Sequence, residues 1–182
     1  MKKILVLTAA AFVFGTTGAF AAEKLVKLDA SGGNAKDHWV MFVSKAMAPA
    51  APAGTAAVAV GQGDKFEGAF GMSVVGGKPV ASAVSEETVK SERASDKEPI
   101  ASTMIIAVTA EQHDEVKALV EKWSAIEEHT DAPNNVTANF VVDVVDALGM
   151  KRAYRSGLQP VNPIQYFEDL AVLNRKLGKD NT

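Results

Sequence analysis

The stretch that decides the fold is Asn134–Met150, which reads Asn-Asn-Val-Thr-Ala-Asn-Phe-Val-Val-Asp-Val-Val-Asp-Ala-Leu-Gly-Met. Large apolar residues recur in it at helical spacing, namely Phe140, Val141, Val144, Val145 and Leu148. This spacing predicts a helix with one apolar face, which Asn134 or Asn135 would cap and Gly149 would end. Valine is a poor helix former because its branched side chain is restricted, so burial must stabilise such a helix. We therefore predict that it is the central helix of the domain.

The N-terminal residues are typical of a secretory signal peptide. Two lysines at positions 2 and 3 precede an apolar run over residues 4–14, and residues 19–21, Ala-Phe-Ala, form an A-x-A cleavage site. The run is shorter than the about 20 apolar residues of a membrane span, although a retained N-terminal anchor is the alternative. Cleavage after Ala21 would leave residues 22–182 in the periplasm or secreted, without stable membrane insertion.

Composition narrows the class of protein further. The predicted mature chain is long enough for one domain with its own core and too short for two. Loss of the two lysines of the signal peptide changes the formal net charge from −3 to −5. The chain has no basic cluster with interleaved aromatic residues, so we expect no nucleic-acid partner. It also has no cysteine, which excludes a lipoprotein anchor, a thiol nucleophile and a thiolate metal site.

The order of the segments predicts the fold class. Residues 22–36 are predicted to form a flexible leader, in which residues 25–28 could be an edge strand, and residues 37–182 a single domain. Strands are predicted at 38–46, 55–61, 66–75 and 100–108, followed by a helix that the Thr109–Gln112 capping box opens, the central helix, and a last helix from Pro163. Residues 82–99 are interpreted as a solvated loop that could carry a helical turn, with a binding surface as the alternative. Strands followed by helices indicate an α+β domain, in which an antiparallel sheet packs against about three helices.

The histidines and the glycine-rich segments give no strong signal for a metal or a cofactor. The three histidines, His38, His113 and His129, do not share metal-ligand spacing, and we expect His113 to lie in a solvated helix start. Gly61-Gln62-Gly63 follows a strand but opens no helix, so it lacks the context of a dinucleotide-binding loop. We therefore predict no cofactor and no metal.

Thr137 is a candidate for a catalytic nucleophile. It lies in the first turn of the central helix, where the partial positive charge of a helix N-terminus favours a nucleophile. A threonine nucleophile also needs an adjacent base, which only a histidine from elsewhere in the chain could supply. An inert threonine in the helix is the simpler interpretation.

Four segments of the sequence are informative because of their order along the chain. Residues 54–61 read Gly-Thr-Ala-Ala-Val-Ala-Val-Gly, and Phe-Glu-Gly-Ala-Phe-Gly follows at 66–71. Residues 134–141 read Asn-Asn-Val-Thr-Ala-Asn-Phe-Val, and residues 160–167 read Pro-Val-Asn-Pro-Ile-Gln-Tyr-Phe. In this order they resemble the strand with the catalytic histidine, the next strand, the helix with the catalytic cysteine and the final helix of the papain-like NlpC/P60 superfamily, in its circularly permuted branch. The resemblance spans residues 37–177 and implies a papain-like fold.

The resemblance places threonine at both catalytic positions. Thr137 matches the nucleophilic cysteine and Thr55 matches the histidine base. A cysteine–histidine pair works because the base helps to generate and hold a thiolate, which two threonines cannot do. The resemblance therefore implies a pseudo-enzyme of a cysteine peptidase/amidase superfamily. Its groove would be kept for binding a peptide, a peptidoglycan fragment or a protein partner, and the implied binding residues are Thr55, Thr137, Asn135, Glu67 and His38.

Two alternatives stay open. The chain could be a peptidase- or amidase-like hydrolase that uses Thr137 with a recruited base, His38 being the first candidate. It could also be an inhibitor or structural partner protein without a substrate groove. The positions of the three histidines relative to the Thr137 hydroxyl discriminate between catalysis and binding.

Overall fold

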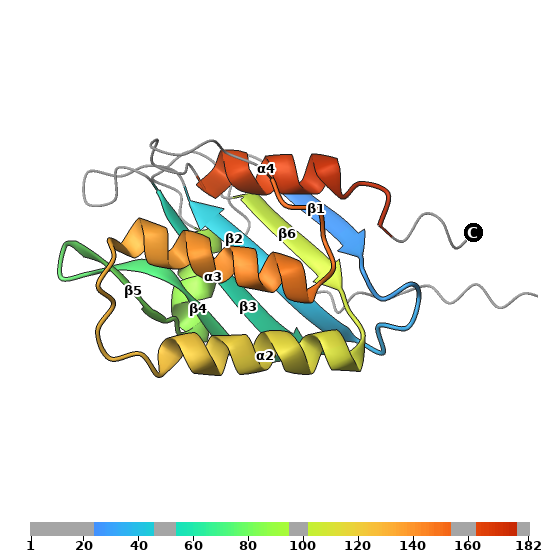
Figure 1. The fold of residues 1–182 in the computed structure, drawn as a ribbon, viewed down its shortest axis with the longest axis horizontal. Coiled ribbons are helices and arrows are strands. Elements are labelled where there is room, and N and C mark those ends of the chain that lie inside the picture. Colours follow the sequence, from blue (N-terminus) through green and yellow to red (C-terminus); the bar gives the residue numbers. More distant parts are fainter. Residues whose placement is uncertain (1–23, 46–53, 95–101, 154–162, 178–182) are drawn as a thin grey trace, which may run out of the picture.

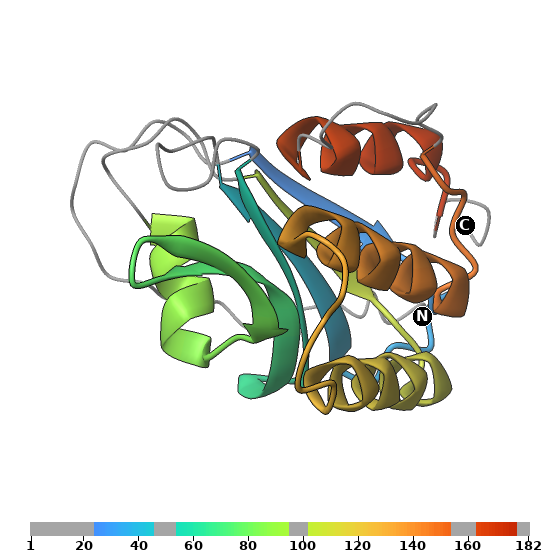
Figure 2. The same cartoon turned by 60° about the vertical axis from the view of Figure 1, so that its left-hand side comes forward.

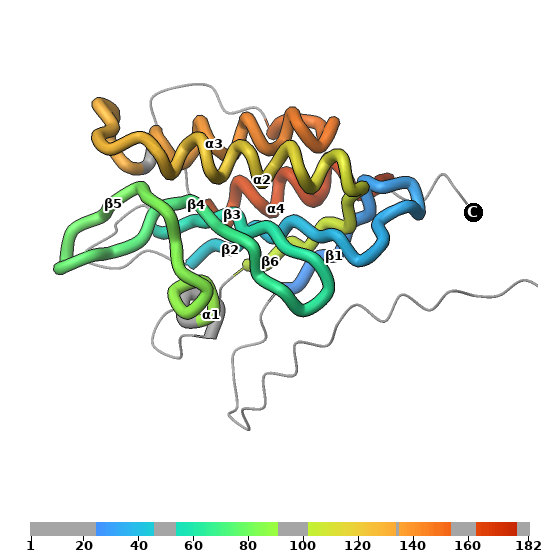
Figure 3. The backbone as a smooth tube through the Cα atoms, turned by 90° about the horizontal axis from the view of Figure 1, so that it is seen from below, coloured from blue at the N-terminus to red at the C-terminus, as the bar shows by residue number. Residues whose placement is uncertain are grey.

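The computed structural model describes residues 24–45, 54–94, 102–153 and 163–177, which form one six-stranded sheet with helices on both faces (Figure 1). In chain order the elements are β1 (Lys24–Asp29), β2 (His38–Lys45), β3 (Thr55–Gln62), β4 (Lys65–Val75), β5 (Lys78–Ala83), α1 (Glu86–Ala94), β6 (Ser102–Ala107), α2 (Ala110–Ser124), α3 (Pro133–Ala147) and α4 (Pro163–Leu173). Helices α2, α3 and α4 cover one face of the sheet and α1 covers the other (Figures 2 and 3). The predicted α+β class is confirmed. None of the helices in the described ranges is long and apolar enough to cross a membrane.

The strand order across the sheet is β1-β6-β2-β3-β4-β5. Strands β2 to β5 form an antiparallel meander, β6 pairs antiparallel with β2, and β1 pairs with β6 in parallel. Strand β6 therefore lies between the first two strands of the chain. Strand β1 falls within residues 22–36, which the sequence predicts to be a flexible leader, and Ser31 and Ala35 after it are both 5% exposed. The described part of the predicted leader thus belongs to the folded domain.

Helix α3 is the central helix of its layer, as the sequence predicts, and lies between α2 and α4 (Figure 1). Its apolar side chains are at most 3% exposed, namely Phe140, Val141, Val144, Val145 and Leu148. They belong to one hydrophobic core with sheet residues such as Val58, Phe70 and Met104. Burial against the sheet therefore stabilises this valine-rich helix.

The start of α3 differs from the expectation. Its N-cap residue is Ala132, Pro133 lies in the first turn, and no side chain caps the helix. Proline has a φ that suits the first helical position and no N–H to satisfy, so the helix begins before the two predicted caps, Asn134 and Asn135. The prediction of an asparagine cap is therefore wrong. Gly149, with a φ of 63°, follows the helix in the left-handed conformation that the sequence predicts.

The sequence predicts a loop over residues 82–99, but the end of β5 and helix α1 lie within this range. Residues 95–99 of the predicted loop lie outside the described residues. Strand β5 pairs with β4 across the Gly76–Gly77 turn. In α1, Val89 is 2% exposed and packs in a second, smaller hydrophobic cluster on the face of the sheet that α1 covers. Glu86 and Lys90, one turn apart, form an ion pair at 2.6 Å. One buried valine in a charged segment gives no apolar period from which a helix could be detected.

Both edge strands carry residues that disfavour further pairing. Val75 and Lys78 close a two-residue turn, so the next pair, Val74 and Pro79, directs its backbone nitrogens away from the partner strand. Proline has no N–H, so the open edge of β5 lacks a donor at this point. Strand β1, at the other edge, carries two lysines. Such residues protect sheet edges from pairing with other chains.

Asn174 joins the end of α4 to the segment that follows α3. Its side chain is 3% exposed. The side-chain oxygen accepts the backbone N–H of Lys151 at 2.7 Å, and the side-chain nitrogen donates to the carbonyls of Lys151 and Leu170, both at 2.9 Å. One amide group therefore satisfies three backbone groups and fixes α4 relative to α3.

We predict that Asn174→Ala lowers the free energy of unfolding by about 1–3 kcal/mol, because buried backbone groups lose their partners. Thermal unfolding followed by circular dichroism measures the loss. Lys176→Ala, at an exposed position nearby, is the matched control. Equal stability of the two variants would show that Asn174 does not clamp the helices.

Candidate functional site

The two threonines that match the catalytic positions of the superfamily lie on opposite faces of the sheet. Side chains alternate between the two faces along β3. Val58 packs in the core beneath α2, α3 and α4, whereas Ala57 packs in the smaller cluster with Val89 of α1. Thr55 shares the side of Ala57, while Thr137 lies on α3 over the other face. The structure therefore does not bring Thr55 and Thr137 together.

Thr137 has no base in place. Its side chain is 5% exposed, and its Oγ1 atom makes no hydrogen bond with any described residue. A hydroxyl nucleophile needs a base within hydrogen-bond reach, and none of the three histidines meets this condition. Asn135, in the first turn of the same helix, is exposed.

His129 belongs to an aromatic cluster at the connection between α2 and α3. Its ring stacks on Trp123 with the centroids 6.0 Å apart, and meets Phe70 edge-on at 5.7 Å. Trp123 Nε1 donates a hydrogen bond of 3.1 Å to Asp143 of α3. These contacts give His129 a packing role at the far end of α2.

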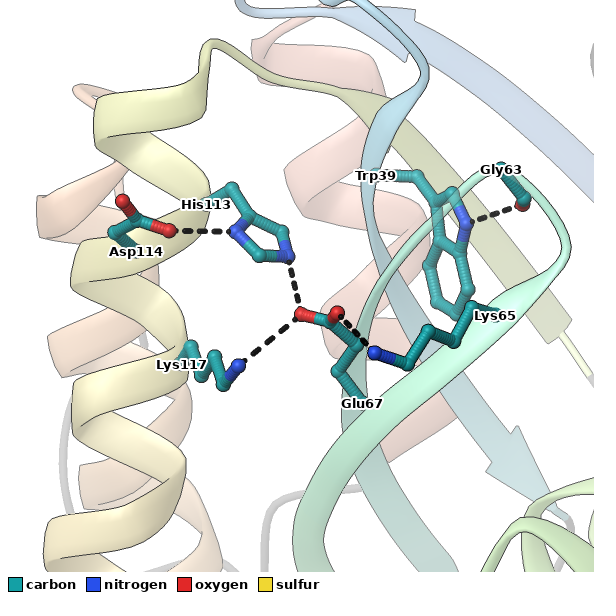
Figure 4. Close-up of polar contacts among 7 residues, drawn as sticks. All are labelled: Trp39, Gly63, Lys65, Glu67, His113, Asp114 and Lys117. Carbon is teal, nitrogen blue, oxygen red and sulfur yellow. Dashed lines mark hydrogen bonds and ion pairs between the residues drawn. The ribbon is translucent and has the colours of Figure 1, made fainter.

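Glu67 gathers side chains from α2 and β4 around one carboxylate (Figure 4). His113 Nε2 and Lys117 Nζ lie 3.1 and 3.3 Å from Glu67 Oε2, and Lys65 Nζ lies 3.2 Å from Oε1. His113 Nδ1 lies 2.9 Å from Asp114 Oδ1. The Glu67 side chain is only 10% exposed. We call Glu67, Lys65, His113, Asp114 and Lys117 the Glu67 cluster.

A β-bulge directs Glu67 into this cluster. Val60 pairs with Gly68 whereas Gly61 pairs with Phe66, so Glu67 is the extra residue of β4. Strict alternation along β4 would have placed its carboxylate on the α1 face. The bulge changes the alternation, so that Phe66 packs on the α1 face and Glu67 reaches α2.

The predicted capping box sets the register of α2. The Gln112 N–H donates to Thr109 Oγ1 at 3.1 Å, and the Thr109 N–H donates to Gln112 Oε1 at 2.9 Å. His113, Val116 and Val120 then share the buried face of the helix. His113 is 3% exposed. The expectation of a solvated histidine is therefore wrong, because His113 is the first residue of the buried stripe.

A strained backbone positions His38 beside the cluster. Lys36 and Asp37 have φ values of 41° and 68°, in the left-handed region that residues other than glycine seldom adopt. The Asp37 carbonyl accepts the N–H of Gly63 at 2.9 Å, which ties this turn to the β3–β4 turn. The ring of His38 lies 4.6 Å from that of His113. Its Nδ1 atom is buried without a hydrogen-bond partner among the described residues.

The lysines keep Glu67 ionised in its buried position. Burial alone would raise the pKa of this carboxyl, but the hydrogen bonds and positive charges of Lys65 and Lys117 lower the pKa below its ordinary value of 4.5. Both ring nitrogens of His113 face carboxylate oxygens, Nε2 at ion-pair distance but outside hydrogen-bond geometry.

The structure unites two of the predicted binding residues and separates the other three. Glu67 and His38 meet on either side of His113, whereas Thr137 and Asn135 lie on α3 and Thr55 lies on the opposite face. Lys65, Lys117 and the burial of His113 were not predicted from the sequence. For His113 and Lys117 the available signal was their i, i+4 spacing beside the apolar stripe of α2.

The chemistry of the Glu67 cluster suits binding of a polar ligand. Its members supply cationic donors, carboxylates and an imidazole, but no hydroxyl or thiol group. Within the described residues, no group of three His, Cys, Asp or Glu side chains could hold a metal ion.

No protein family, curated protein or solved structure matches this chain. The resemblance to the NlpC/P60 superfamily therefore stays a prediction, and the function is inferred from the geometry of the Glu67 cluster.

We predict that Glu67→Gln destabilises the protein near neutral pH and has little effect in acid. The pKa of Glu67 in the folded protein is below 4.5, so the ionised carboxylate stabilises the fold fully above that pH. This contribution is lost as the pH falls through the folded-state pKa. Thermal unfolding, followed from a pH below the folded-state pKa up to neutral pH, measures the difference in stability between wild type and variant. Glu121→Gln, at an exposed position of α2, is the control, and a difference that does not change with pH would refute the predicted linkage.

We also predict that restoring the two residues of the superfamily, with Thr55→His and Thr137→Cys together, yields no hydrolysis. The two side chains lie on opposite faces of the sheet, so a histidine at 55 cannot act on a thiol at 137. Release of fragments from peptidoglycan measures activity, and circular dichroism confirms that the double variant folds. Hydrolysis by the double variant, but not by Thr137→Cys alone, would overturn this placement of Thr55.

Proposed function

We propose that this chain is an exported, non-catalytic domain that binds a peptide, a cell-wall fragment or a partner protein at the Glu67 cluster. The observation that carries the proposal is the convergence of Lys65, Lys117 and the buried His113 on the Glu67 carboxylate, whose side chain is only 10% exposed. Removing most of a carboxylate from water is costly unless partners compensate for it. A charged cluster in which the pKa of the central carboxyl is perturbed is therefore a candidate functional site.

Two irregularities of the backbone support the same location. The bulge at Glu67 and the left-handed residues before His38 both deliver polar side chains to one end of the sheet. Bulges and strained residues are enriched at functional sites, where they aim side chains that regular structure would point elsewhere. Their convergence favours a ligand-binding role for the Glu67 cluster.

Thr137 supports binding over hydrolysis. Its hydroxyl has no hydrogen-bond partner among the described residues, so it lacks the base that a threonine nucleophile requires. The signal-peptide pattern favours the periplasm or secretion as the location.

The purified mature protein should bind peptidoglycan, soluble muropeptides or peptides without cleaving them. Binding is measured by co-sedimentation and calorimetry, and cleavage by mass spectrometry of the same samples. Glu67→Gln should weaken binding by about tenfold, because a neutral amide no longer holds Lys65 and Lys117 in place for the ligand, while Glu121→Gln should leave binding unchanged.

Cleavage would contradict the proposal if Thr137→Ala abolished it, because Thr137 would then be a nucleophile. Binding that Glu67→Gln leaves unchanged would remove the ligand from the Glu67 cluster. No binding to peptidoglycan, muropeptides or peptides would remove the peptide and the cell-wall fragment from the proposal.

A further inference from the structure

We infer that the ligand group bound at the Glu67 cluster is a carboxylate, held by the ammonium groups of Lys65 and Lys117; this inference rests on the proposed binding function. The first reason is the balance of charge. Lys65 and Lys117 carry two positive charges against the single negative charge of Glu67, whereas Asp114 contacts Nδ1 of His113, the ring nitrogen that does not face Glu67. The three charged groups that meet at Glu67 therefore carry one positive charge in excess, which an anionic group would complement.

The second reason is the number of hydrogen-bond donors. Each ammonium group has three N–H donors, and each lysine makes one contact with Glu67, at 3.2 Å for Lys65 and 3.3 Å for Lys117. Each lysine therefore keeps donors for a further acceptor. Glu67 already faces three side chains through its two oxygens. The cluster can donate to a ligand more readily than it can accept from one.

The third reason is the gradient of exposure from the carboxylate to the lysines. The side chain of Glu67 is 10% exposed, that of Lys117 39% and that of Lys65 74%. Figure 4 shows the two ammonium groups approaching Glu67 from opposite sides, one from α2 and the other from β4. A ligand arriving from solvent thus meets the lysines first. Glu67 holds both of them in place beforehand, which reduces the entropy lost on binding.

A carboxylate fits this arrangement better than a phosphate. Phosphate sites in proteins often use free N–H groups at a helix N-terminus. At the start of α2 the Gln112 N–H already donates to Thr109 Oγ1 within the capping box. The two ammonium groups instead match the two oxygens of a carboxylate, one group for each oxygen.

The test uses blocked tripeptides and inorganic phosphate at constant ionic strength, with NMR of the lysine side chains as the readout. One tripeptide is acetyl-Ala-Ala-Ala with a free C-terminal carboxylate, and its amide is the neutral control. The third is the amide of acetyl-Ala-Glu-Ala, which carries only a side-chain carboxylate. At least one carboxylate peptide should shift the signals of Lys65 and Lys117 saturably. The peptide that does so identifies a chain terminus or an acidic side chain as the source.

Lys117→Met should weaken the binding of that peptide by about tenfold, because it removes one charged donor. Lys122→Met, on the last turn of α2, should leave it unchanged. Lys117→Arg keeps the charge and should keep binding, which separates loss of the donor from loss of folding.

Equal shifts with the neutral amide, tighter binding of phosphate, or no shift at all would overturn the carboxylate assignment. The proposed binding function would survive each of these results, provided that peptidoglycan or peptides still bind and Glu67→Gln still weakens them.

Discussion

The contact between the Glu67 carboxylate and α2 is the interaction on which the candidate site depends. It requires the bulge that turns Glu67 away from the α1 face, and the capping box that sets which residues of α2 face the sheet. It also requires Lys65 and Lys117, since an unpaired buried carboxylate would be strongly destabilising. The bulge in β4 and the register of α2, which are far apart in the sequence, must therefore both be correct for Glu67 to contact α2. Apolar packing alone would not keep a carboxylate at this position, because removing it from water is costly.

The parts of the fold that depend on local sequence could be predicted. Helical spacing identified α3, the Thr109–Gln112 pair identified the start of α2, and the order of strands and helices identified the α+β class. The features that were missed depend on distant partners. The burial of His113 follows from its place above the sheet, and the direction of Glu67 follows from one unpaired residue in a ladder. Neither is visible in the spacing of residues along a single element.

The resemblance to a known superfamily shows the same boundary between local and non-local information. Short segments can share the pattern of a strand and a helix, yet the side on which a strand residue points depends on register within the whole sheet. Thr55 and Thr137 match two catalytic positions in sequence, but alternation along β3 directs Thr55 toward α1 and away from the helix that carries Thr137. Glu67 and His38, both predicted as binding residues and His38 also as a candidate base, are the ones that meet through His113.

Strand β1 is the first element of the described chain, yet its only neighbour in the sheet is β6, with Leu28 opposite Ile106. Every other strand pairs with at least one strand between β2 and β5. A chain that emerges from its N-terminus must therefore leave β1 unpaired until most of the domain has been made, since contacts distant in sequence form late. The order of the elements along the chain thus delays closure of this edge of the sheet until β6 has been made.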